Sequence, residues 1–250
     1  RINLLKTKDY NIFSVLQIQS KEVLICRMIA DLLNPRGQHG AGAEYLKIFL
    51  RDCLGMEKMD TKLADQAIVT AEYAIDDERR IDIVIEIGSY FLPIEVKIYA
   101  ADQKSQCFDY YQYAKRRDAQ AKVYYLTLDG HRPGKDSTSS GSQSVPEEDI
   151  VCLSFREHIL NWLKACKNCG NTGMIPILEQ FIRNIEQISG YTSERVRNMV
   201  IDELLTSGDS LRAGMQIADS INAAKAKLIY QVMEEFEKQL AGVAEKNHWT

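Results

Sequence analysis

The alternation of apolar and polar residues predicts a strand hairpin at the centre of the chain. Residues 80–85 alternate polar and branched apolar side chains with period two, which is typical of a half-buried strand. Gly88 and Ser89 supply turn-forming residues, and a second β-rich run extends from Phe91 to Tyr99. We therefore expect two adjacent strands joined by a tight turn.

The rest of the first 170 residues alternates between helical and strand patterns around this hairpin. Apolar residues recur at helical spacing before the hairpin and again after it, where Asp102 can cap a helix. The predicted order is helix, three strands, helix and strand, which indicates an α/β core with a mixed central sheet flanked by helices. Helices are expected over 11–34, 43–54, 102–118 and 155–167, strands over 67–75, 122–128 and 150–154, and a mobile polar connection over 129–148.

From Met174 onward the pattern is continuously helical. Apolar residues keep one face of each helix, and no constellation of titratable residues accompanies them. We expect a core domain over residues 1–170 and a helical extension over 171–250. Such an extension can pack on the core, clamp nucleic acid or form a homodimer through its helices, and the sequence does not choose among these roles.

Composition describes an ordinary globular protein. A formal net charge of −4 argues against a protein that coats DNA by bulk electrostatics, although a local basic rim can still bind phosphates. There is no run of about 18 apolar residues, so no transmembrane helix is expected. The six cysteines lie mostly within apolar patterns, and a reducing cytoplasm is the simplest compartment.

Two stretches outside the hairpin carry residue types that often bind ligands. Cys166 and Cys169 form the chain's one Cys-x-x-Cys, but no second pair stands at zinc-site spacing, so we expect loop thiols. Residues 36–42 form a glycine-rich loop that lacks the lysine and hydroxyl ending of a nucleotide-binding loop. His39 within it is expected to be structural or exposed, not catalytic.

The hairpin carries the most specific candidate chemistry. Glu95 and Lys97 are two residues apart, so both side chains leave one face of their strand, and Asp82 lies on the neighbouring strand. Two carboxylates on adjacent strands can hold Mg²⁺, and a nearby lysine can orient the attacking water. The alternatives are a solvated ion pair that stabilises little, or a structural ion-pair network.

These residues resemble a known motif. Asp82 and Glu95-Val96-Lys97 are similar to the Asp…Glu-x-Lys motif of the PD-(D/E)XK nuclease superfamily, which has the restriction-endonuclease-like fold. Glu22 matches the glutamate that this superfamily often carries on its first helix. The chain departs from the family name in having Ile81, not proline, before the aspartate.

The resemblance implies a metal-dependent nuclease. Asp82 and Glu95 would hold Mg²⁺, for which Mn²⁺ would substitute, with the Val96 carbonyl as a third ligand. Lys97 would activate the water, and Glu22 would reach the metal through water or hold a second ion. The substrate would be nucleic acid, with DNA preferred over RNA.

Substrate contacts are also implied by the resemblance. Gln106 and Tyr110, one turn apart on the helix after the lysine strand, are similar to a Gln-x-x-x-Tyr of the family and would order the phosphate. Apart from the resemblance, Arg80 leads into the Asp82 strand, where it can meet a phosphate. A surface aromatic stripe packed on a neighbouring element explains Gln106 and Tyr110 equally well. The alternative function is an inactive module of the same fold that binds nucleic acid or a protein partner.

Overall fold

The computed structural model describes residues 10–57, 59–169, 171–191 and 194–246. The chain divides into two compact units, Arg1–Tyr191 and Thr192–Thr250. The expected boundary at residue 170 differs from this division because the next helix, α9 (Ile175–Ile188), packs against α8 (Leu160–Cys166) in the first unit.

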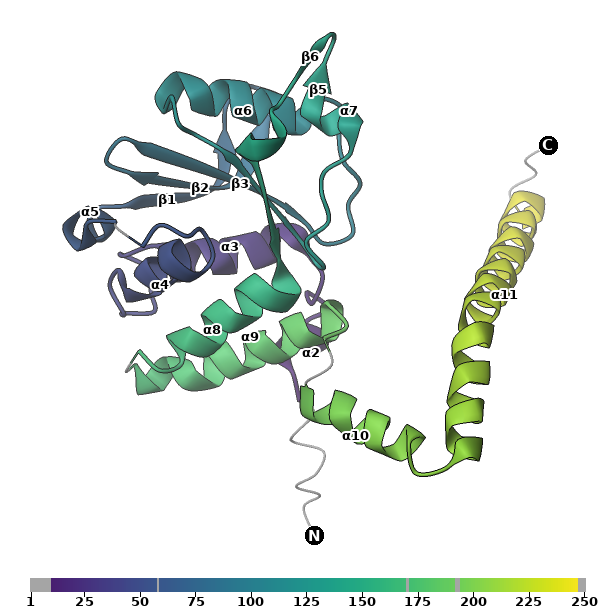
Figure 1. Ribbon diagram of the computed structural model, residues 1–250. Helices are drawn as coiled ribbons and strands as arrows, with labels where there is room; N and C mark the ends of the chain where they lie inside the picture. The colour runs from purple at the N-terminus through teal and green to yellow at the C-terminus, as the bar shows by residue number, and fades with distance from the viewer. Residues whose placement is uncertain (1–9, 58, 170, 192–193, 247–250) are drawn as a thin grey trace. The chain divides into compact units, whose positions relative to one another are not determined.

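The first unit is built on a five-stranded mixed sheet in the order β1-β2-β3-β4-β7 (Figure 1). The first three strands are antiparallel to one another, whereas β3, β4 and β7 run parallel. This confirms the mixed sheet predicted from the sequence. The strands are β1 (Ile68–Ala74), β2 (Arg80–Ile87), β3 (Tyr90–Lys97), β4 (Val123–Thr127) and β7 (Ile150–Ser154).

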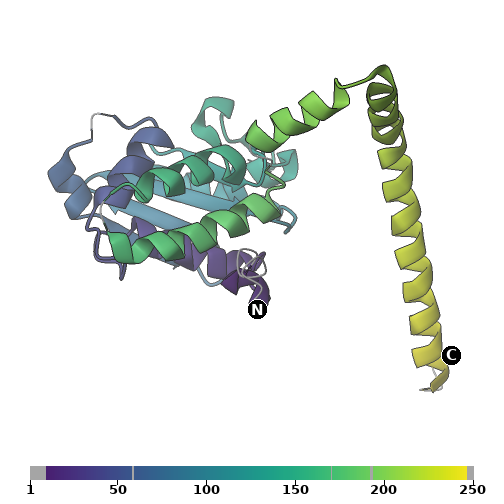
Figure 2. The same cartoon turned by 90° about the horizontal axis from the view of Figure 1, so that it is seen from below.

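Helices cover both faces of this sheet. One face bears α3 (Glu22–Leu33) and α4 (Glu44–Asp52) together with α8 and α9, which lie side by side in Figure 2, and the other bears α6 (Gln106–Arg117). The flanking helices predicted from the sequence are thus confirmed. The predicted first helix over 11–34 is instead two helices, because α2 (Ile12–Val15) ends before Gln17, which has a left-handed backbone.

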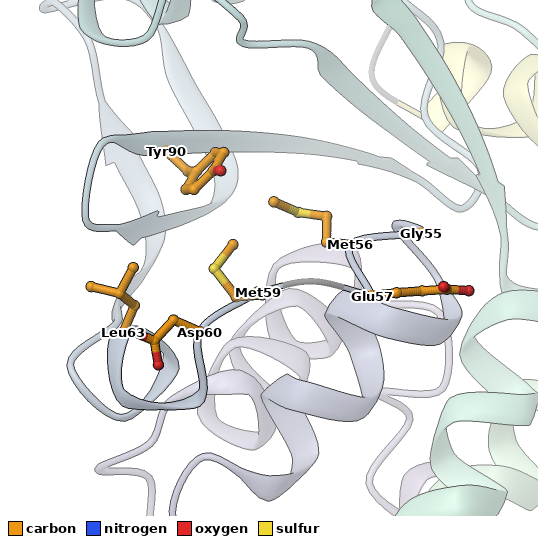
Figure 3. Close-up of a pocket in the computed structure, with 7 residues that line it drawn as sticks. All are labelled: Gly55, Met56, Glu57, Met59, Asp60, Leu63 and Tyr90. Carbon is orange, nitrogen blue, oxygen red and sulfur yellow. The ribbon is translucent and has the colours of Figure 1, made fainter.

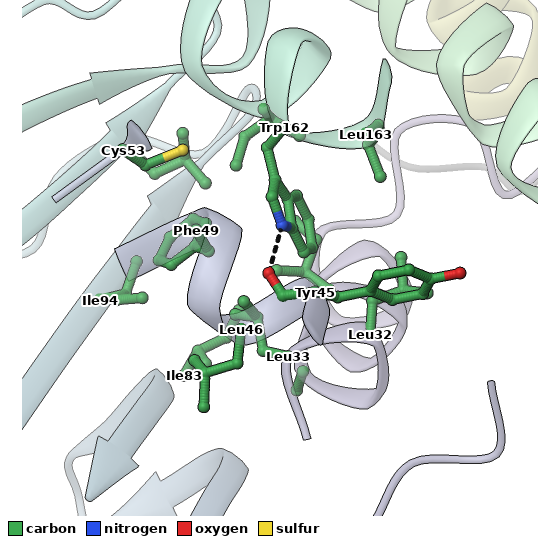
Figure 4. Close-up of a cluster of buried hydrophobic side chains, with 14 of the residues drawn as sticks. Leu32, Leu33, Tyr45, Leu46, Phe49, Cys53, Ile83, Ile94, Trp162 and Leu163 are labelled. Carbon is green, nitrogen blue, oxygen red and sulfur yellow. Dashed lines mark hydrogen bonds between the residues drawn. The ribbon is translucent and has the colours of Figure 1, made fainter. Parts of the chain in front are cut away.

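The larger of two hydrophobic cores lies between the sheet and α3, α4, α8 and α9 (Figure 4). Phe49 meets Trp162 edge to face with ring centroids 5.4 Å apart. The indole N–H of Trp162 donates to the Tyr45 carbonyl over 2.8 Å, so the buried polar atom of this large side chain is paired. The smaller core lies between the sheet and α6.

The segment 129–148, expected to be a mobile connection, is largely folded. It contains the short helix α7 (Lys135–Thr138), the two-stranded β5 (Ser139–Ser140) and β6 (Gln143–Ser144), and the start of a 3₁₀ turn (Glu147–Asp149). Ser137 is fully buried and accepts a hydrogen bond from the Cys107 backbone N–H of α6. Tertiary contacts therefore supply the order that the local composition does not predict.

The remaining elements of the first unit are short, whereas the described part of the second unit consists of two longer helices. The first unit also has α5 (Thr61–Asp65), a π-helical turn (Phe155–Ile159) and a 3₁₀ turn (Thr172–Met174). The second unit consists of α10 (Glu194–Leu204) and α11 (Gly208–Lys246), as the predicted helical extension requires. Among the described helices, none combines the length and apolar character needed to cross a membrane.

Candidate active site

Strands β2 and β3 part at the predicted acidic residues. Their ladder ends at the pair Ile83–Ile94, and the next residues in register are Asp82 and Glu95. Each strand nevertheless stays paired on its outer side, β2 with β1 and β3 with β4. The two strands therefore form a fork, and Asp82 and Glu95 stand at its opening.

The face that β2 presents to the larger core changes at the fork. Ile83 packs in the larger core, yet Ile81, two residues away, packs in the smaller core on the other face. A regular strand keeps residues two apart on one face, so the period is broken at Asp82. The Asp82 carboxylate Oδ2 accepts a hydrogen bond from the Val96 backbone N–H over 2.8 Å. The distortion thus places the Asp82 carboxylate across the fork.

Glu95 and Lys97 form a buried ion pair. The Lys97 Nζ lies 2.5 Å from Glu95 Oε1, and the two residues are 7% and 1% exposed. Glu95 Oε2 is buried and has no hydrogen-bond partner. An unpaired carboxylate oxygen in a protein interior is strongly disfavoured, so this atom marks a place for a cation or an ordered water. The expectation of a solvated ion pair is excluded by this burial.

Burial and mutual repulsion shift the pKa values of these groups. Burial raises the pKa of Glu95 well above its usual range, and the Asp82 charge raises it further. Burial also raises the pKa of Asp82, against the opposing effect of the Val96 hydrogen bond. Burial opposes the charge of Lys97, but the neighbouring carboxylates outweigh this effect and its pKa is raised. A cation bound between the carboxylates would relieve their repulsion.

Glu22 reaches the same end of β3 from α3. Its Oε2 accepts a hydrogen bond from the Ile98 backbone N–H over 2.7 Å, one residue past Lys97. One turn farther along α3, Cys26 is fully buried, and its pKa is raised first by burial and then by the charges of Asp82, Glu22 and Glu95. The structure therefore brings the carboxylate of the first helix to the fork.

The predicted substrate-binding residues Gln106 and Tyr110 lie on α6, which covers the face of the sheet that carries Glu95, opposite α3. The Tyr110 hydroxyl donates to the Arg80 carbonyl over 2.5 Å, and the Gln106 side-chain amide donates to the Tyr110 hydroxyl over 3.1 Å. Gln106 and Tyr110 are buried, whereas Arg80 is exposed. These contacts hold α6 against the start of β2, two residues before Asp82. This packing fits the alternative of an aromatic stripe packed on a neighbouring element, and the substrate role of Gln106 and Tyr110 stays a prediction.

Glu72 on β1 is a residue that the sequence analysis missed. It stands opposite Asp82, where the β1–β2 register omits a pair, and its backbone is left-handed with φ 53°. The core face switches here as well, since Ala71 packs towards the larger core and Tyr73 towards the smaller. Its Oε2 pairs with Arg27 Nη2 of α3 over 2.6 Å. The sequence shows Glu72 only as a carboxylate within a β-prone run. The strand register is needed to place Glu72 beside Asp82.

His39 is structural, as expected. Its Nδ1 accepts a hydrogen bond from the Ala41 backbone N–H, which leaves Nε2 to donate to the Asn34 carbonyl over 2.9 Å. The ring stacks on Tyr45 with centroids 4.7 Å apart. These contacts fix the glycine-rich loop and leave no ring nitrogen for catalysis.

The acid–lysine cluster lies outside the cavity beside the hairpin turn and outside the Cys166–Cys169 pair. A cavity of about 510 Å³ is lined by Met56, Met59, Leu63 and Tyr90, among others, beside the turn of the β2–β3 hairpin (Figure 3). Cys166 and Cys169 are free thiols. Across the described part of the chain, no three or more His, Cys, Asp or Glu side chains are grouped so as to hold a metal ion. The fork itself offers two carboxylates with one unpaired oxygen, a donor set that suits a divalent cation completed by backbone and water oxygens.

Comparison with known proteins agrees with the motif. The family model of the PD-(D/E)XK nuclease superfamily matches residues 10–249. No curated protein and no solved structure matches the chain. The mixed sheet flanked by helices is consistent with the restriction-endonuclease-like fold of that superfamily. With almost its whole length covered, the chain belongs to the PD-(D/E)XK nuclease superfamily.

Proposed function

We propose that this protein hydrolyses phosphodiester bonds of DNA with Mg²⁺, and that Mn²⁺ supports the same reaction. The observation that carries the proposal is the buried, unpaired Oε2 of Glu95 beside Asp82 and Lys97 at the strand fork. Most buried polar atoms in proteins are hydrogen-bonded. Among the described residues, four buried side-chain oxygens lack a partner, and Glu95 Oε2 is the one that belongs to a carboxylate. Nuclease chemistry accounts for the unpaired oxygen, because a divalent cation between two carboxylates would bind it.

Asp82, Glu95 and the Val96 carbonyl are the proposed metal ligands. The Val96 N–H already points into the fork, and the carbonyl of a strand residue lies on the same side as its N–H. When bound, the cation polarises the phosphate and acidifies a water. Glu22 would hold a metal-bound water or a second ion from the α3 side.

Lys97 is the proposed water-positioning and water-activating group. Its ammonium is held at the fork by Glu95, from which it can hydrogen-bond to the attacking water and stabilise the hydroxide form. Glu95 thereby has two functions, since one oxygen holds Lys97 and the other is left for the cation. Removing Lys97 would disrupt the water and leave the carboxylates in place.

Arg80, Gln106 and Tyr110 are the proposed substrate contacts. Arg80 is exposed at the start of β2 and can pair with a backbone phosphate. Gln106 and Tyr110 would act on the phosphate through Arg80, because the Tyr110 hydroxyl fixes its carbonyl. This arrangement couples substrate binding to the position of Asp82.

The biological setting is also part of the proposal. All six cysteines are free, which suits the reducing cytoplasm. We include a homodimer held by the C-terminal helices. The proposed nuclease core extends through α9 to Tyr191, and the helical extension consists of α10 and α11. DNA is the preferred substrate over RNA.

A nuclease-fold module without activity is the second candidate. It is favoured by the Lys97–Glu95 ion pair, which occupies one of the candidate ligand oxygens, and by the lack of a three-residue metal cluster in the described ranges. Such a module would bind nucleic acid or protein with no need for a divalent cation. Metal dependence therefore separates the two functions.

The test is cleavage of plasmid, linear and single-stranded DNA with Mg²⁺, Mn²⁺ or EDTA. Lys97→Ala and Asp82→Asn are compared with Lys164→Ala, which removes a lysine that is 42% exposed on α8. We expect the first two variants to lose at least about 100-fold in rate, as when a proton-transfer group is removed, while the third cleaves like wild type. Mn²⁺ binding, measured by calorimetry, should be lost in Asp82→Asn and retained in Lys97→Ala.

Two results would refute the nuclease assignment. One is wild-type cleavage in both site variants. The other is a folded wild-type protein that neither cleaves nor binds Mn²⁺, which would identify the binding module.

A further inference from the structure

The long helix α11 exposes a row of large apolar side chains. The helix has 39 residues, and exposure along the row runs from 47% at Ile221 to 62% at Val232. A helix of this kind in water is stabilised by packing its apolar face on a partner. The exposed members of the row are Ile221, Leu228, Ile229, Val232, Met233, Phe236 and Leu240.

The row is symmetric about a point between Tyr230 and Gln231. Reversing the chain direction about that point exchanges Ile221 with Leu240, Leu228 with Met233, and Ile229 with Val232. Six of the seven members of the row are thus exchanged with another apolar residue, and the seventh, Phe236, is exchanged with Lys225. Successive helix positions turn by about 100° around the helix axis. With this turn, the residues before the midpoint and their exchange partners after it lie on one face of α11.

A self-complementary face of this kind fits a second copy of the same helix. Two-fold interfaces require that a residue on one copy meets its exchange partner on the other. When two helices run antiparallel with this midpoint aligned, the three pairs above face one another across the contact. The overlap from Ile221 to Leu240 extends for about 30 Å.

Lys225 decides the direction of the pairing. It lies within the apolar row, four residues after Ile221 and three before Leu228. Parallel helices in register would bring the two Lys225 ammonium groups together in the apolar contact, which is destabilising. In the antiparallel arrangement Lys225 lies against Phe236 of the other copy, where a cation over the ring is favourable, and next to Glu235.

We propose that this protein forms a homodimer through an antiparallel pair of α11 helices centred between Tyr230 and Gln231. The interface joins the exposed apolar rows and places each Lys225 between Phe236 and Glu235 of the opposite copy. The proposal concerns α11 alone and does not depend on cleavage.

The first test is the oligomeric state of the full chain, measured by sedimentation equilibrium. Ile229→Glu puts a charge at the centre of the row and should weaken dimerisation at least tenfold. Tyr230→Glu is the matched control, because Tyr230 is 75% exposed and points about 100° away from Ile229. It should leave the dimer intact. A monomeric wild-type chain at about 100 µM, well above the micromolar range of ordinary interfaces, would overturn the proposal, as would equal dimerisation of Ile229→Glu and Tyr230→Glu.

The second test is the direction of the helices. A zero-length carbodiimide cross-link between Lys225 and Glu235 cannot form within one helix, because ten residues span about 15 Å. Its detection by mass spectrometry would therefore establish antiparallel contact. Lys238 and Glu234, whose charged atoms lie 3.9 Å apart in one helix, provide the internal positive control. A dimer that yields the control cross-link without the Lys225–Glu235 product would overturn the antiparallel arrangement.

Discussion

The strand fork and the long helix α11 are mismatched to their surroundings in opposite ways. At the fork, a polar atom is buried without a partner, namely Oε2 of Glu95. On α11, apolar side chains such as Phe236 are exposed without one. A buried carboxylate oxygen requires a cation or a donor, whereas an exposed apolar row requires another apolar surface. The comparison teaches that the type of mismatch identifies the type of missing partner.

The two regions also differ in how their residues contribute to stability. Side chains around Trp162 are packed on all sides, and their contacts are already made within one chain. The apolar residues of α11 make their proposed contacts only with a second chain. Substitutions of equal size should therefore have unequal effects on the folding of the core.

The largest expected effect follows from this contrast. Phe49→Ala removes a ring that is 1% exposed and packed against Trp162, so the free energy of unfolding of the core should fall by about 3–5 kcal/mol. Phe236→Ala removes the same ring from α11 and should change core unfolding by no more than about 0.5 kcal/mol. The measurement is urea unfolding followed by the fluorescence of Trp162.

The concentration dependence supplies the control for that pair. Phe236→Ala should weaken dimerisation and Phe49→Ala should not. Dimerisation is compared in buffer without urea, where both variants are folded. If Phe236→Ala destabilised the core as much as Phe49→Ala, α11 would pack on the core and the contrast between the regions would be lost.

The sequence predicts the hairpin and its acidic residues because both depend on local patterns. Period-two alternation identifies the strands, and the two-residue spacing of Glu95 and Lys97 places both on one face. Burial does not follow from such patterns. Glu95 is buried because α6 covers that face of the sheet, and a contact between segments of this kind is not encoded in the local spacing.

The fork was not predictable for the same reason. It depends on which β2 residue faces which residue of β1 and β3, and register is a property of the assembled sheet. Folding of the segment 129–148 was missed because Ser137 gains its order from a backbone N–H thirty residues away in the chain. The Asp102 cap was wrong for a related reason, since its carboxylate accepts instead from Tyr125 and from Gly134.

The pH dependence of stability sharpens the description of the fork. The pKa of Asp82 is raised in the metal-free protein, so its contribution to stability is complete below its unfolded pKa and declines as the pH rises through the folded pKa. Asp82→Asn keeps an acceptor for the Val96 N–H and abolishes this loss. We expect the variant to have a higher Tm than wild type at pH 7 in EDTA, and no advantage near pH 3.5. Mn²⁺ should raise the Tm of wild type alone.

Asp149 is the control, because its pKa is lowered whereas that of Asp82 is raised. Although burial opposes it, hydrogen bonds from Tyr111 and Lys115 lower the pKa of Asp149. Its stabilising contribution is present above the unfolded pKa and is lost as the pH falls. Asp149→Asn should therefore lower the Tm at pH 7 and have little effect near pH 3. If both variants shifted the Tm in the same direction at pH 7, repulsion at the fork would not explain the behaviour of Asp82.

The smallest expected effect concerns the backbone beside the fork. Glu72 has φ 53°, a conformation that costs an L-residue about 1–2 kcal/mol and glycine almost nothing. Both Glu72→Gly and Glu72→Ala remove the partly exposed ion pair with Arg27, so their difference isolates the backbone. Glu72→Gly should be more stable than Glu72→Ala by about 1 kcal/mol in thermal unfolding.

Thr70 on the same strand gives the comparison that decides the cause. Its backbone is not left-handed, so Thr70→Gly should be less stable than Thr70→Ala by about 0.5–1 kcal/mol. Reversal of the Gly–Ala ranking between these two positions would show that β1 is distorted at Glu72, opposite Asp82. The same ranking at both would mean that β1 is regular there, and the displacement of Asp82 towards Val96 would have to originate in β2 and β3 alone.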